Sequence, residues 1–450
     1  MCPGGGPGVY PSINAALSAL DSQGPNSITV AGTCTENIFL DKRERLVIQA
    51  APGQTATIVA ADPSAIVLQT FGSQGVVLSS LVFQGGVNGV VVNQGSNVSI
   101  LNCTVQQNSS DGLVVQIGST LVIESSTFQN NGGNGMSVGA SSNVTLATSP
   151  GERILFQGNG GDGIDVDGSY FQVNFGSLTV QNNVGAALVA FGGRVLIFGG
   201  DGGENIFQNN GEGIDFLNAA SATLFGKNTI RANGDVGLQV SGSSVAINGN
   251  LLPDGTPNAT VIEGHATLGV NLVRMGEVTF NGPHKIRNNS NAAADPILIS
   301  GIRVVRGSLT LVQNPEVSGN FGPGIRAEQN SGLSLSKSTI VNNTQEGVRV
   351  TLQSEAAFPV APFFSGNGVA SISCDTTSLI SGSLAGISNI DCSRIVQHAG
   401  SGTTGKNSEL APGAQSHTRL FRFGKRDRHD VVGVLLKWRR LCSGFETALT

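Results

Sequence analysis

The chain has 450 residues, of which 63 are glycine, and only 12% of its residues are charged. Glycine costs a helix interior roughly 1 kcal/mol, so a content twice the usual ~7% argues against a helical bundle or a coiled coil. A hydrophobic content of 39% with a net charge of -5 excludes a wholly disordered chain. The composition leaves a β-rich protein with many turns.

The beginning of the chain predicts one short helix. Residues 1–11 have neither the basic region nor the apolar stretch of a signal peptide, and we expect them to be a flexible N-terminus. Residues 12–20 place their apolar side chains on one helical face, so this helix is expected to cover the open end of a repeat structure. The residues on that face are Ile13, Ala16, Leu17 and Leu20.

A repeat occupies most of the chain that follows. Each unit begins with an apolar residue, has a fixed position three residues later, and continues with Gly and a short apolar alternation. The units begin at Phe83, Val105, Phe128, Phe156, Val180, Phe207, Ile230, Ile262, Ile286, Val317, Ile340 and Phe364. Asn occupies the fixed position in most units, as Asn108, Asn131, Asn159, Asn183, Asn210, Asn233, Asn289, Asn320, Asn343 and Asn367. The exceptions are Gly86 and His265.

This pattern predicts a β-solenoid. The alternations are strands of three to five residues, which are too short to be stable alone and are therefore expected to pair in parallel with the next coil. Asn at one turn can adopt the left-handed conformation and bond its amide to the Asn above and below, forming a ladder. Gly, Ser and Asn between the strands argue against the helices of a leucine-rich repeat, and the period is too short for a β-propeller.

The unit FQGNGGDGIDVDGS, from Phe156 to Ser169, resembles the repeats of the pectin-lyase-like superfamily. The resemblance covers roughly Ser12 to Ile395 and identifies no subfamily. It implies an all-β fold, a right-handed parallel β-helix of about fourteen coils over residues 12–395. That superfamily includes polysaccharide lyases, hydrolases, epimerases and esterases, and also phage tailspikes and adhesins. The resemblance therefore implies a fold and no single activity.

Acidic residues cluster around one outward position of the repeat. The candidate catalytic residues are Asp162, Asp165, Glu212 and Asp215, and Asp167 is a candidate substrate ligand. Two strand spacings of ~4.8 Å would separate the two pairs by ~10 Å. That distance suits a Ca²⁺ site or two carboxyl groups flanking a sugar. Tyr170, expected in a loop over residues 168–176, could stack on the sugar ring.

Three arginines follow at the same outward position, and they are the remaining candidate substrate ligands: Arg303, Arg326 and Arg349. The alternative is a solvated basic stripe without a ligand. Asp162-Gly163 and Gly301-Ile302-Arg303 resemble parts of the motifs of pectin-degrading hydrolases of this fold. The chain departs from those motifs at Gly211-Glu212-Gly213, where they have a doubled Asp, and at Val305, where they have Lys.

Two features lie near the end of the chain. Cys374 and Cys392 are 18 residues apart, and they form either a disulfide or two buried thiols. Residues 397–450 hold nine Lys and Arg but four Asp and Glu, a net charge of +5, against -10 for the preceding residues. We expect residues 396–450 to be a basic tail outside the solenoid. The tail either binds a membrane or nucleic acid, or is an accidental or disordered extension.

The sequence favours a secreted or cell-surface protein that binds or processes a polysaccharide. The alternative is a non-catalytic structural or adhesin-type solenoid, and the sequence leaves open whether the protein is an enzyme. An acidic β-helix is not expected to bind nucleic acid. No apolar stretch is long enough to span a membrane, and Ca²⁺ is the one cofactor that the acidic residues suggest.

Overall fold

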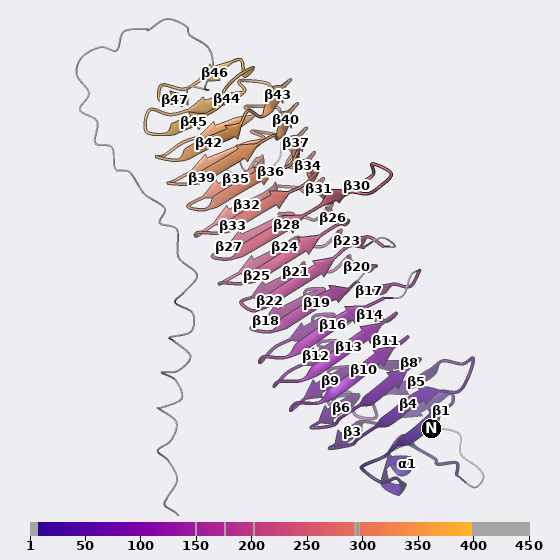
Figure 1. Cartoon of the computed structure of the whole chain (residues 1–450). Helices are drawn as coiled ribbons and strands as arrows, with labels where there is room; N and C mark the ends of the chain where they lie inside the picture. Colours follow the sequence, from indigo (N-terminus) through magenta and orange to yellow (C-terminus); the bar gives the residue numbers. More distant parts are fainter. Residues whose placement is uncertain are drawn as a thin grey trace, which may run out of the picture. The chain divides into compact units, whose positions relative to one another are not determined.

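The computed structural model describes residues 8–148, 151–174, 177–200, 203–291, 295 and 298–397. Within them the chain winds into successive coils, most of which contribute one strand to each of three parallel sheets, A, B and C (Figure 1). The sheets have 16, 14 and 15 strands. The predicted parallel β-helix is therefore confirmed, with one short helix in the described part of the chain.

Sheet A alternates buried apolar residues with outward Ser, Thr and Asn. Leu121 and Ile123, for example, are fully buried between outward neighbours. This period of two is what a strand with one buried face requires. The strands of sheet A are β1 (Asn26–Val30), β4 (Leu46–Ala50), β7 (Val76–Ser79), β10 (Asn97–Leu101), β13 (Thr120–Glu124), β16 (Asn143–Ala147), β19 (Tyr170–Asn174), β22 (Arg194–Phe198), β25 (Ser221–Phe225), β28 (Ser244–Asn248), β33 (Glu277–Asn281), β36 (Ser308–Val312), β39 (Gly332–Ser336), β42 (Glu355–Val360), β45 (Leu379–Gly382) and β47 (Ile395–Gln397).

Sheet B carries the residues that begin the twelve predicted units, in register from Phe83 to Phe364. They form one inward apolar column, in which Phe128 stacks on Phe156 with ring centroids 4.7 Å apart. The strands of sheet B are β2 (Thr33–Thr35), β5 (Ala56–Val59), β8 (Leu81–Gln84), β11 (Thr104–Gln106), β14 (Thr127–Gln129), β17 (Ile154–Gln157), β20 (Leu178–Gln181), β23 (Asn205–Gln208), β26 (Asn228–Arg231), β31 (Thr260–Glu263), β34 (Lys285–Arg287), β37 (Glu316–Ser318), β40 (Thr339–Val341) and β43 (Phe363–Ser365).

Sheet C contains the strands that follow the repeated Gly. Ile164 and Val166 of β18 are fully buried, and Asp165 between them points outward. The strands of sheet C are β3 (Ile38–Asp41), β6 (Leu68–Phe71), β9 (Val90–Asn93), β12 (Leu113–Val115), β15 (Met136–Val138), β18 (Ile164–Asp167), β21 (Ala186–Phe191), β24 (Glu212–Leu217), β27 (Leu238–Ser241), β32 (Leu268–Val273), β35 (Ser300–Val305), β38 (Ile325–Glu328), β41 (Val348–Val350), β44 (Ile372–Cys374) and β46 (Ile390–Asp391).

The predicted Asn ladder stands at the corner between sheets B and C. Where one ladder Asn follows another, its backbone N and its Nδ2 both donate to Oδ1 of the next Asn; the Asn159–Asn183 distances are 3.0 and 2.9 Å. The expectation that these Asn adopt the left-handed conformation is wrong. The residue before each one does so, as at Asn130 and Asn182 with φ of 54° and 57°. The turn therefore uses one residue for its backbone bend and the next for the ladder.

His265 replaces Asn within this ladder and makes the same kinds of bond. Its Nδ1 accepts from the backbone N of Asn233 at 3.3 Å, and its Nε2 lies 3.0 Å from the carbonyl oxygen of Ile230. Burial lowers the pKa of His265 to about 4, so the ring is neutral and one nitrogen can accept. His265 is therefore a member of the ladder in this structure.

Helix α1 (Ile13–Ala19) covers the first coil, as predicted from its apolar face. Ile13, Ala16 and Leu17 are buried, and the Ser12 hydroxyl accepts from the backbone N of Ala15. Glu36 was not anticipated: its carboxylate accepts from the backbone N atoms of Ile13 and Asn14, at 2.7 and 2.9 Å. This carboxylate satisfies two amide groups that a helix start leaves without partners.

A hairpin, β29 (Asn250–Leu251) and β30 (Pro257–Asn258), interrupts the regular coil where the interval between units is long. The expected loop over residues 168–176 is wrong. Its described residues continue into β19, which pairs with β16 and β22 in sheet A. The interval between unit starts there, from Phe156 to Val180, has an ordinary coil length and holds one strand in each sheet, which a count of residues between units does not reveal.

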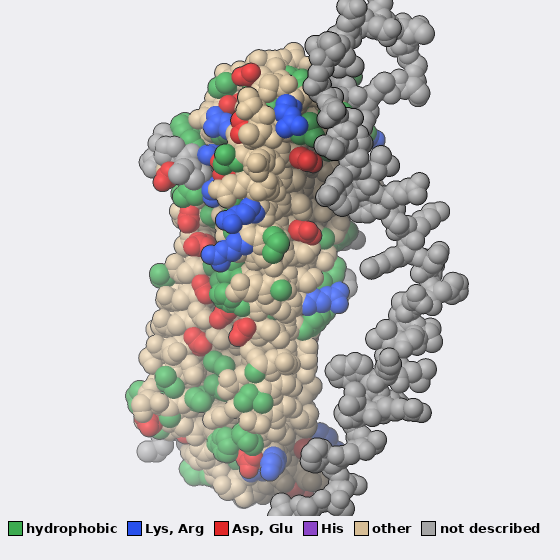
Figure 2. Space-filling model, turned by 90° about the vertical axis from the view of Figure 1, so that its left-hand side faces the viewer, with side chains coloured by type: hydrophobic (Ala, Val, Ile, Leu, Met, Phe, Trp, Pro, Cys, Tyr) green, Lys and Arg blue, Asp and Glu red, His purple; other side chains and the backbone are tan. Residues whose placement is uncertain are grey.

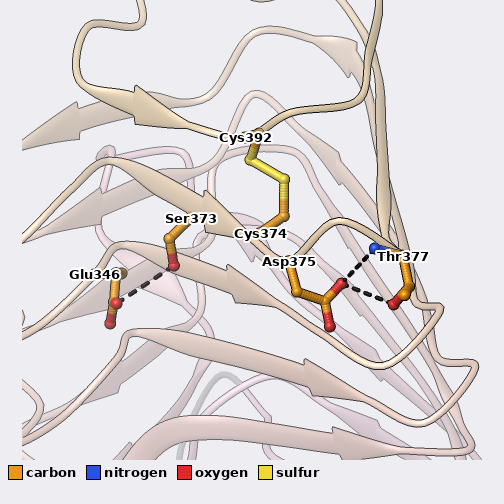
Figure 3. The surroundings of a disulfide bond; sticks show 6 residues. All are labelled: Glu346, Ser373, Cys374, Asp375, Thr377 and Cys392. Carbon is orange, nitrogen blue, oxygen red and sulfur yellow. Dashed lines mark hydrogen bonds between the residues drawn. A yellow bond between two sulfur atoms is a disulfide. The ribbon is translucent and has the colours of Figure 1, made fainter.

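Cys374 of β44 and Cys392 form a disulfide with Cα atoms 4.9 Å apart (Figure 3). It joins two of the last described coils. Ser373, beside it, donates to Glu346 of the preceding coil, at 3.3 Å. The predicted basic tail lies outside the described residues, except that Val396 and Gln397 belong to β47. Likewise, residues 1–7 of the expected flexible N-terminus are outside them.

Candidate functional site

One outward column of sheet C brings the candidate residues into line. Strand pairing places one residue from each successive coil in register, and the predicted column is the observed one. In chain order it consists of Asp165, Val189, Asp215, Gln239, Asn271, Arg303, Arg326 and Arg349. The column runs from acidic through amide to basic side chains. On the face seen in Figure 2, basic side chains likewise gather nearer the C-terminal end of the β-helix than most acidic ones.

Asp165 and Asp215 lie two strands apart with Val189 between them. Two parallel strand spacings correspond to about 10 Å between their backbones. Both side chains face outward from β18 and β24 because their neighbours Ile164, Val166, Ile214 and Phe216 fill the core. The buried apolar alternation therefore fixes the direction of both carboxyl groups.

Asp215 borders a hollow of about 400 Å³ on the surface of sheet C. The hollow is shallow, and Gly185 and Gly211 leave space for it because they carry no side chain. Asp215 itself is only 9% exposed. The residues around the hollow are Asp162, Val184, Gly185, Ala186, Val189, Gly211, Glu212, Asp215, Gly234 and Asp235.

The two aspartates have different proton affinities. Burial raises the pKa of Asp215 to about 9, and Glu212 beside it adds to the rise through its charge and through a side-chain hydrogen bond. Burial also raises the pKa of Asp165, to about 6, with the charges of Asp162 and Asp167 as further causes. At neutral pH, Asp215 is therefore protonated and Asp165 is mostly ionised. Such a divergence between neighbouring carboxyl groups is typical of acid–base sites.

Three oxygen atoms of this column are buried and have no hydrogen-bond partner: Oδ1 of Asp165, Oδ1 of Asp215 and Oδ1 of Asn271. The other amide atom of Asn271, Nδ2, donates to Gln239 at 2.8 Å. Buried polar atoms are nearly always satisfied in native proteins, so each exception needs an explanation. Three exceptions on one outward column are consistent with a ligand that supplies the missing partners.

Asp162 has a structural function in addition to its place beside the hollow. Its Oδ1 accepts from the backbone N of Ala186 at 2.7 Å, and its own backbone N donates to Asn134 Oδ1 at 2.7 Å. Asp111 makes the same bond to the backbone N of Asn134. These residues form a second ladder along the turn before sheet C. Burial raises the pKa of Asp162.

Tyr170 lies on sheet A as the first residue of β19, in register with Asn143 and Arg194. Its hydroxyl donates to Gln172 of the same strand. The structure therefore separates Tyr170 from the column on sheet C. Asp167 ends β18 and is exposed, in register with Phe191.

Sequence reasoning missed Phe191, an aromatic side chain that is 40% exposed on sheet C. It ends β21, beside Asp167 on one side and Leu217 on the other. The alternation of Leu188 inward, Val189 outward and Ala190 inward would have placed Phe191 outward. The sequence does not show which side chains of β21 point outward, because all of its residues are apolar.

The three arginines are in register but are not a solvated stripe. Arg303 and Arg326 share Glu328, at 3.4 and 2.5 Å, and Arg349 pairs with Glu346 at 2.8 Å. Both glutamates are nearly buried, and the side chains of Arg303 and Arg326 are 16% exposed. The expectation of a solvated stripe is wrong because it overlooked these acidic residues. Substrate binding by the arginines remains a prediction.

The calcium site also remains a prediction. Among the described residues, no group of three or more His, Cys, Asp or Glu side chains is placed to hold a metal ion. Glu212 and Asp215 could supply two oxygen ligands, and Ca²⁺ usually takes ~6–8. The carboxyl groups of this chain alone therefore fit Ca²⁺ poorly. No helix in the described part of the chain is long and apolar enough to cross a membrane.

Comparison with known families matches residues 56–202 to the family described as right handed beta helix region. The match covers less than half of the chain, and the described residues on both sides of it continue the same parallel β-helix. No match is found among curated proteins. Among solved structures, the β-helix is similar to the A-module of mannuronan C-5 epimerase AlgE4 from Azotobacter vinelandii, at 12% identity over 81% of this chain and 91% of that one, with a TM-score of 0.36.

Two further similar structures are pectate lyase Pel9A and the catalytic unit of a GH87 alpha-1,3-glucanase from Streptomyces thermodiastaticus. Pectate lyase Pel9A is 11% identical over 68% of this β-helix chain and 72% of its own, with a TM-score of 0.34. The glucanase is 14% identical over 85% of this chain and 64% of its own, with a TM-score of 0.38. At such low identity and TM-score, the activities of these proteins say nothing about the activity of this one.

Proposed function

We propose that this β-helix protein binds a polysaccharide along the outward column of sheet C and hydrolyses its glycosidic bonds with Asp215 and Asp165. The observation that carries the proposal is the pairing of these two carboxyl groups, in register two strands apart, one protonated and one ionised at neutral pH. Glycoside hydrolysis needs one carboxyl group in each of these states.

In this reaction Asp215 gives its proton to the glycosidic oxygen as the bond from that oxygen to the anomeric carbon breaks. A water molecule adds to the anomeric carbon from the opposite face and loses a proton to Asp165. The ~10 Å between the two backbone positions is near the ~6.5–9.5 Å between carboxyl groups that leaves room for such a water. Inversion at the anomeric carbon is therefore the expected stereochemical outcome.

The same column has features that suit sugar binding. The unpartnered oxygens of Asp165, Asp215 and Asn271 can accept from sugar hydroxyl groups, which would satisfy them. Phe191, exposed beside Asp167, offers an apolar ring face next to the carboxyl groups. Repeated polar positions, one per coil, match a ligand that is itself a repeating chain.

A location outside the cytoplasm is part of this proposal. The Cys374–Cys392 disulfide supports it, because disulfides persist mainly in oxidising compartments. A polysaccharide substrate would be encountered in the same places.

The test is release of reducing ends from a panel of neutral, acidic and amino polysaccharides. Asp215→Asn and Asp165→Asn are expected to lower kcat by at least a hundredfold, the usual scale of general acid–base catalysis. Asp254→Asn, an exposed carboxyl group in the hairpin turn, is the matched control and should leave kcat unchanged. Melting temperatures of all three variants exclude unfolding as the cause.

Two results would contradict the catalytic part. The first is full activity in both Asp215→Asn and Asp165→Asn. The second is that the wild-type protein releases reducing ends from none of the polysaccharides. Binding without release would favour the non-catalytic adhesin-type solenoid, for which the shallow hollow and the ion-paired arginines are the supporting observations.

A further inference from the structure

The hollow beside Asp215 is lined by four carboxyl groups and by no basic side chain. Asp162, Glu212, Asp215 and Asp235 all border it. They come from three of four successive coils: the turn before β18, the start of β24 and the turn before β27. β21, which crosses the middle of the hollow, contributes only apolar side chains.

Basic residues of the same coils lie on the other two sheets. Between Asp111 and Asp235 the chain has four, and none is on a strand of sheet C. Arg153 bonds Thr179 of sheet B, Arg194 begins a strand of sheet A, and Arg231 bonds Gln208 of sheet B. Lys227 directly precedes β26 of sheet B.

The nearest arginine on the column is Arg303. It lies three strand spacings, about 14 Å, from Asp215, and it is paired with Glu328. The residues around the hollow therefore carry negative charge that no cation among them offsets.

A second observation points to a ligand in this hollow. Asp215 is only 9% exposed, and its Oδ1 has no partner although it borders the hollow. An ammonium group carries three donors and a positive charge, which fits several acceptor oxygens in one place. A sugar carboxylate would instead add a negative charge beside Asp162, Glu212 and Asp235.

We infer that the polysaccharide bound here is cationic, a polymer of amino sugars with free ammonium groups, and that uronic acid polymers are disfavoured. This inference rests on the proposed function, because it assumes that the hollow holds a sugar of the bound chain. The ammonium group would pair with Glu212, Asp162 and Asp235, which leaves Asp215 to meet the glycosidic oxygen.

The test compares three probes that differ mainly in charge: a glucosamine hexamer, its N-acetylated counterpart and a galacturonic acid hexamer. Calorimetric titration of the full chain should show the free-amine hexamer binding at least tenfold tighter than the N-acetylated one, with the advantage lost as salt is added. The galacturonic acid hexamer should bind most weakly.

A matched pair of variants locates the effect. Asp162→Asn removes one charge but keeps the turn ladder, which already uses Asn at the neighbouring position Asn134. It should weaken binding of the free-amine hexamer about fivefold, equivalent to ~1 kcal/mol. Asp111→Asn changes the same ladder outside the hollow and should alter binding by less than twofold.

The outcomes separate this inference from the proposed function. Equal binding of the two glucosamine hexamers, or tightest binding of the galacturonic acid hexamer, would overturn the cationic substrate and leave the polysaccharide site standing. Equal effects of Asp162→Asn and Asp111→Asn would overturn the assignment to this hollow. If none of the three hexamers binds, the inference and the proposed binding site are both wrong.

Discussion

Asp215 links the stability of this protein to its chemistry. Its carboxyl group is buried against Glu212 in a hollow that has no cation, and this keeps it protonated at neutral pH. A proton held at that position is what the proposed hydrolysis requires. The same arrangement costs stability whenever the proton is removed.

Stability is therefore expected to fall as pH rises from 6.5 to 9. Between the ordinary pKa of an aspartate and about 9, the folded state binds a proton that the unfolded state has released, so the free energy of unfolding decreases with pH. The loss should approach about 3 kcal/mol at pH 9, at ~1.4 kcal/mol per pH unit. Urea unfolding of the wild-type chain and of Asp215→Asn measures it.

The variant supplies the comparison for this prediction, because Asn cannot titrate. Its free energy of unfolding should be nearly flat over the same range. Burial lowers the pKa values of His265 and His284 to about 4. These two residues therefore lower the free energy of unfolding only as pH falls below 6.5, outside the range of this measurement. Identical slopes for both chains would show that Asp215 does not hold the proton.

At the residue scale the sequence predicted the register of Asp165 and Asp215 correctly, because register follows from the repeat. It did not predict that Glu212 would raise the pKa of Asp215, or that Glu328 would pair with two arginines. Those contacts depend on how side chains turn in three dimensions. Charge and spacing along the chain do not determine that.

At the scale of one coil, close packing requires glycine at a specific position. A Cβ at Gly135 would lie 2.6 Å from the carbonyl oxygen of Gly163 and 2.9 Å from Asn159 Nδ2. Gly therefore leaves room for the Asn ladder and for the Phe156 ring beneath the turn. The repeated Gly before sheet C is a packing requirement as well as a turn residue.

Gly135→Ala is accordingly expected to lower the free energy of unfolding by about 2–3 kcal/mol, because backbone and ladder must shift to admit the methyl group. Gly139→Ala, in the same coil, is the matched control: nothing lies within 4 Å of its added Cβ. That control should be neutral or slightly stabilising. Chemical denaturation of both variants gives the difference, and equal effects would refute the packing explanation.

The sequence predicted elements well where their pattern repeats, and poorly where it does not. The twelve unit starts fall on one column of sheet B as expected. The segment from Gly168 was expected to be a loop, yet Tyr170 begins a strand whose inward Phe171 is fully buried. The interval between unit starts gives the length of a coil without revealing which of its residues form strands.

At the scale of the whole β-helix, each coil contacts mainly its two neighbours. Energetics in such an array are close to nearest-neighbour sums, so an effect at one coil fades within a few coils. A ligand on the proposed site should therefore leave a local signature on sheet C. The rest of the stack should be unaffected.

Hydrogen exchange with and without a saturating glucosamine hexamer would locate the bound polysaccharide on the β-helix. We expect slower amide exchange confined to β18, β21, β24 and β27 and the turns that precede them, with the same pattern weakened in Asp162→Asn. Protection centred on sheet A or sheet B, or no protection at a concentration where binding is measured, would contradict a polysaccharide site on sheet C.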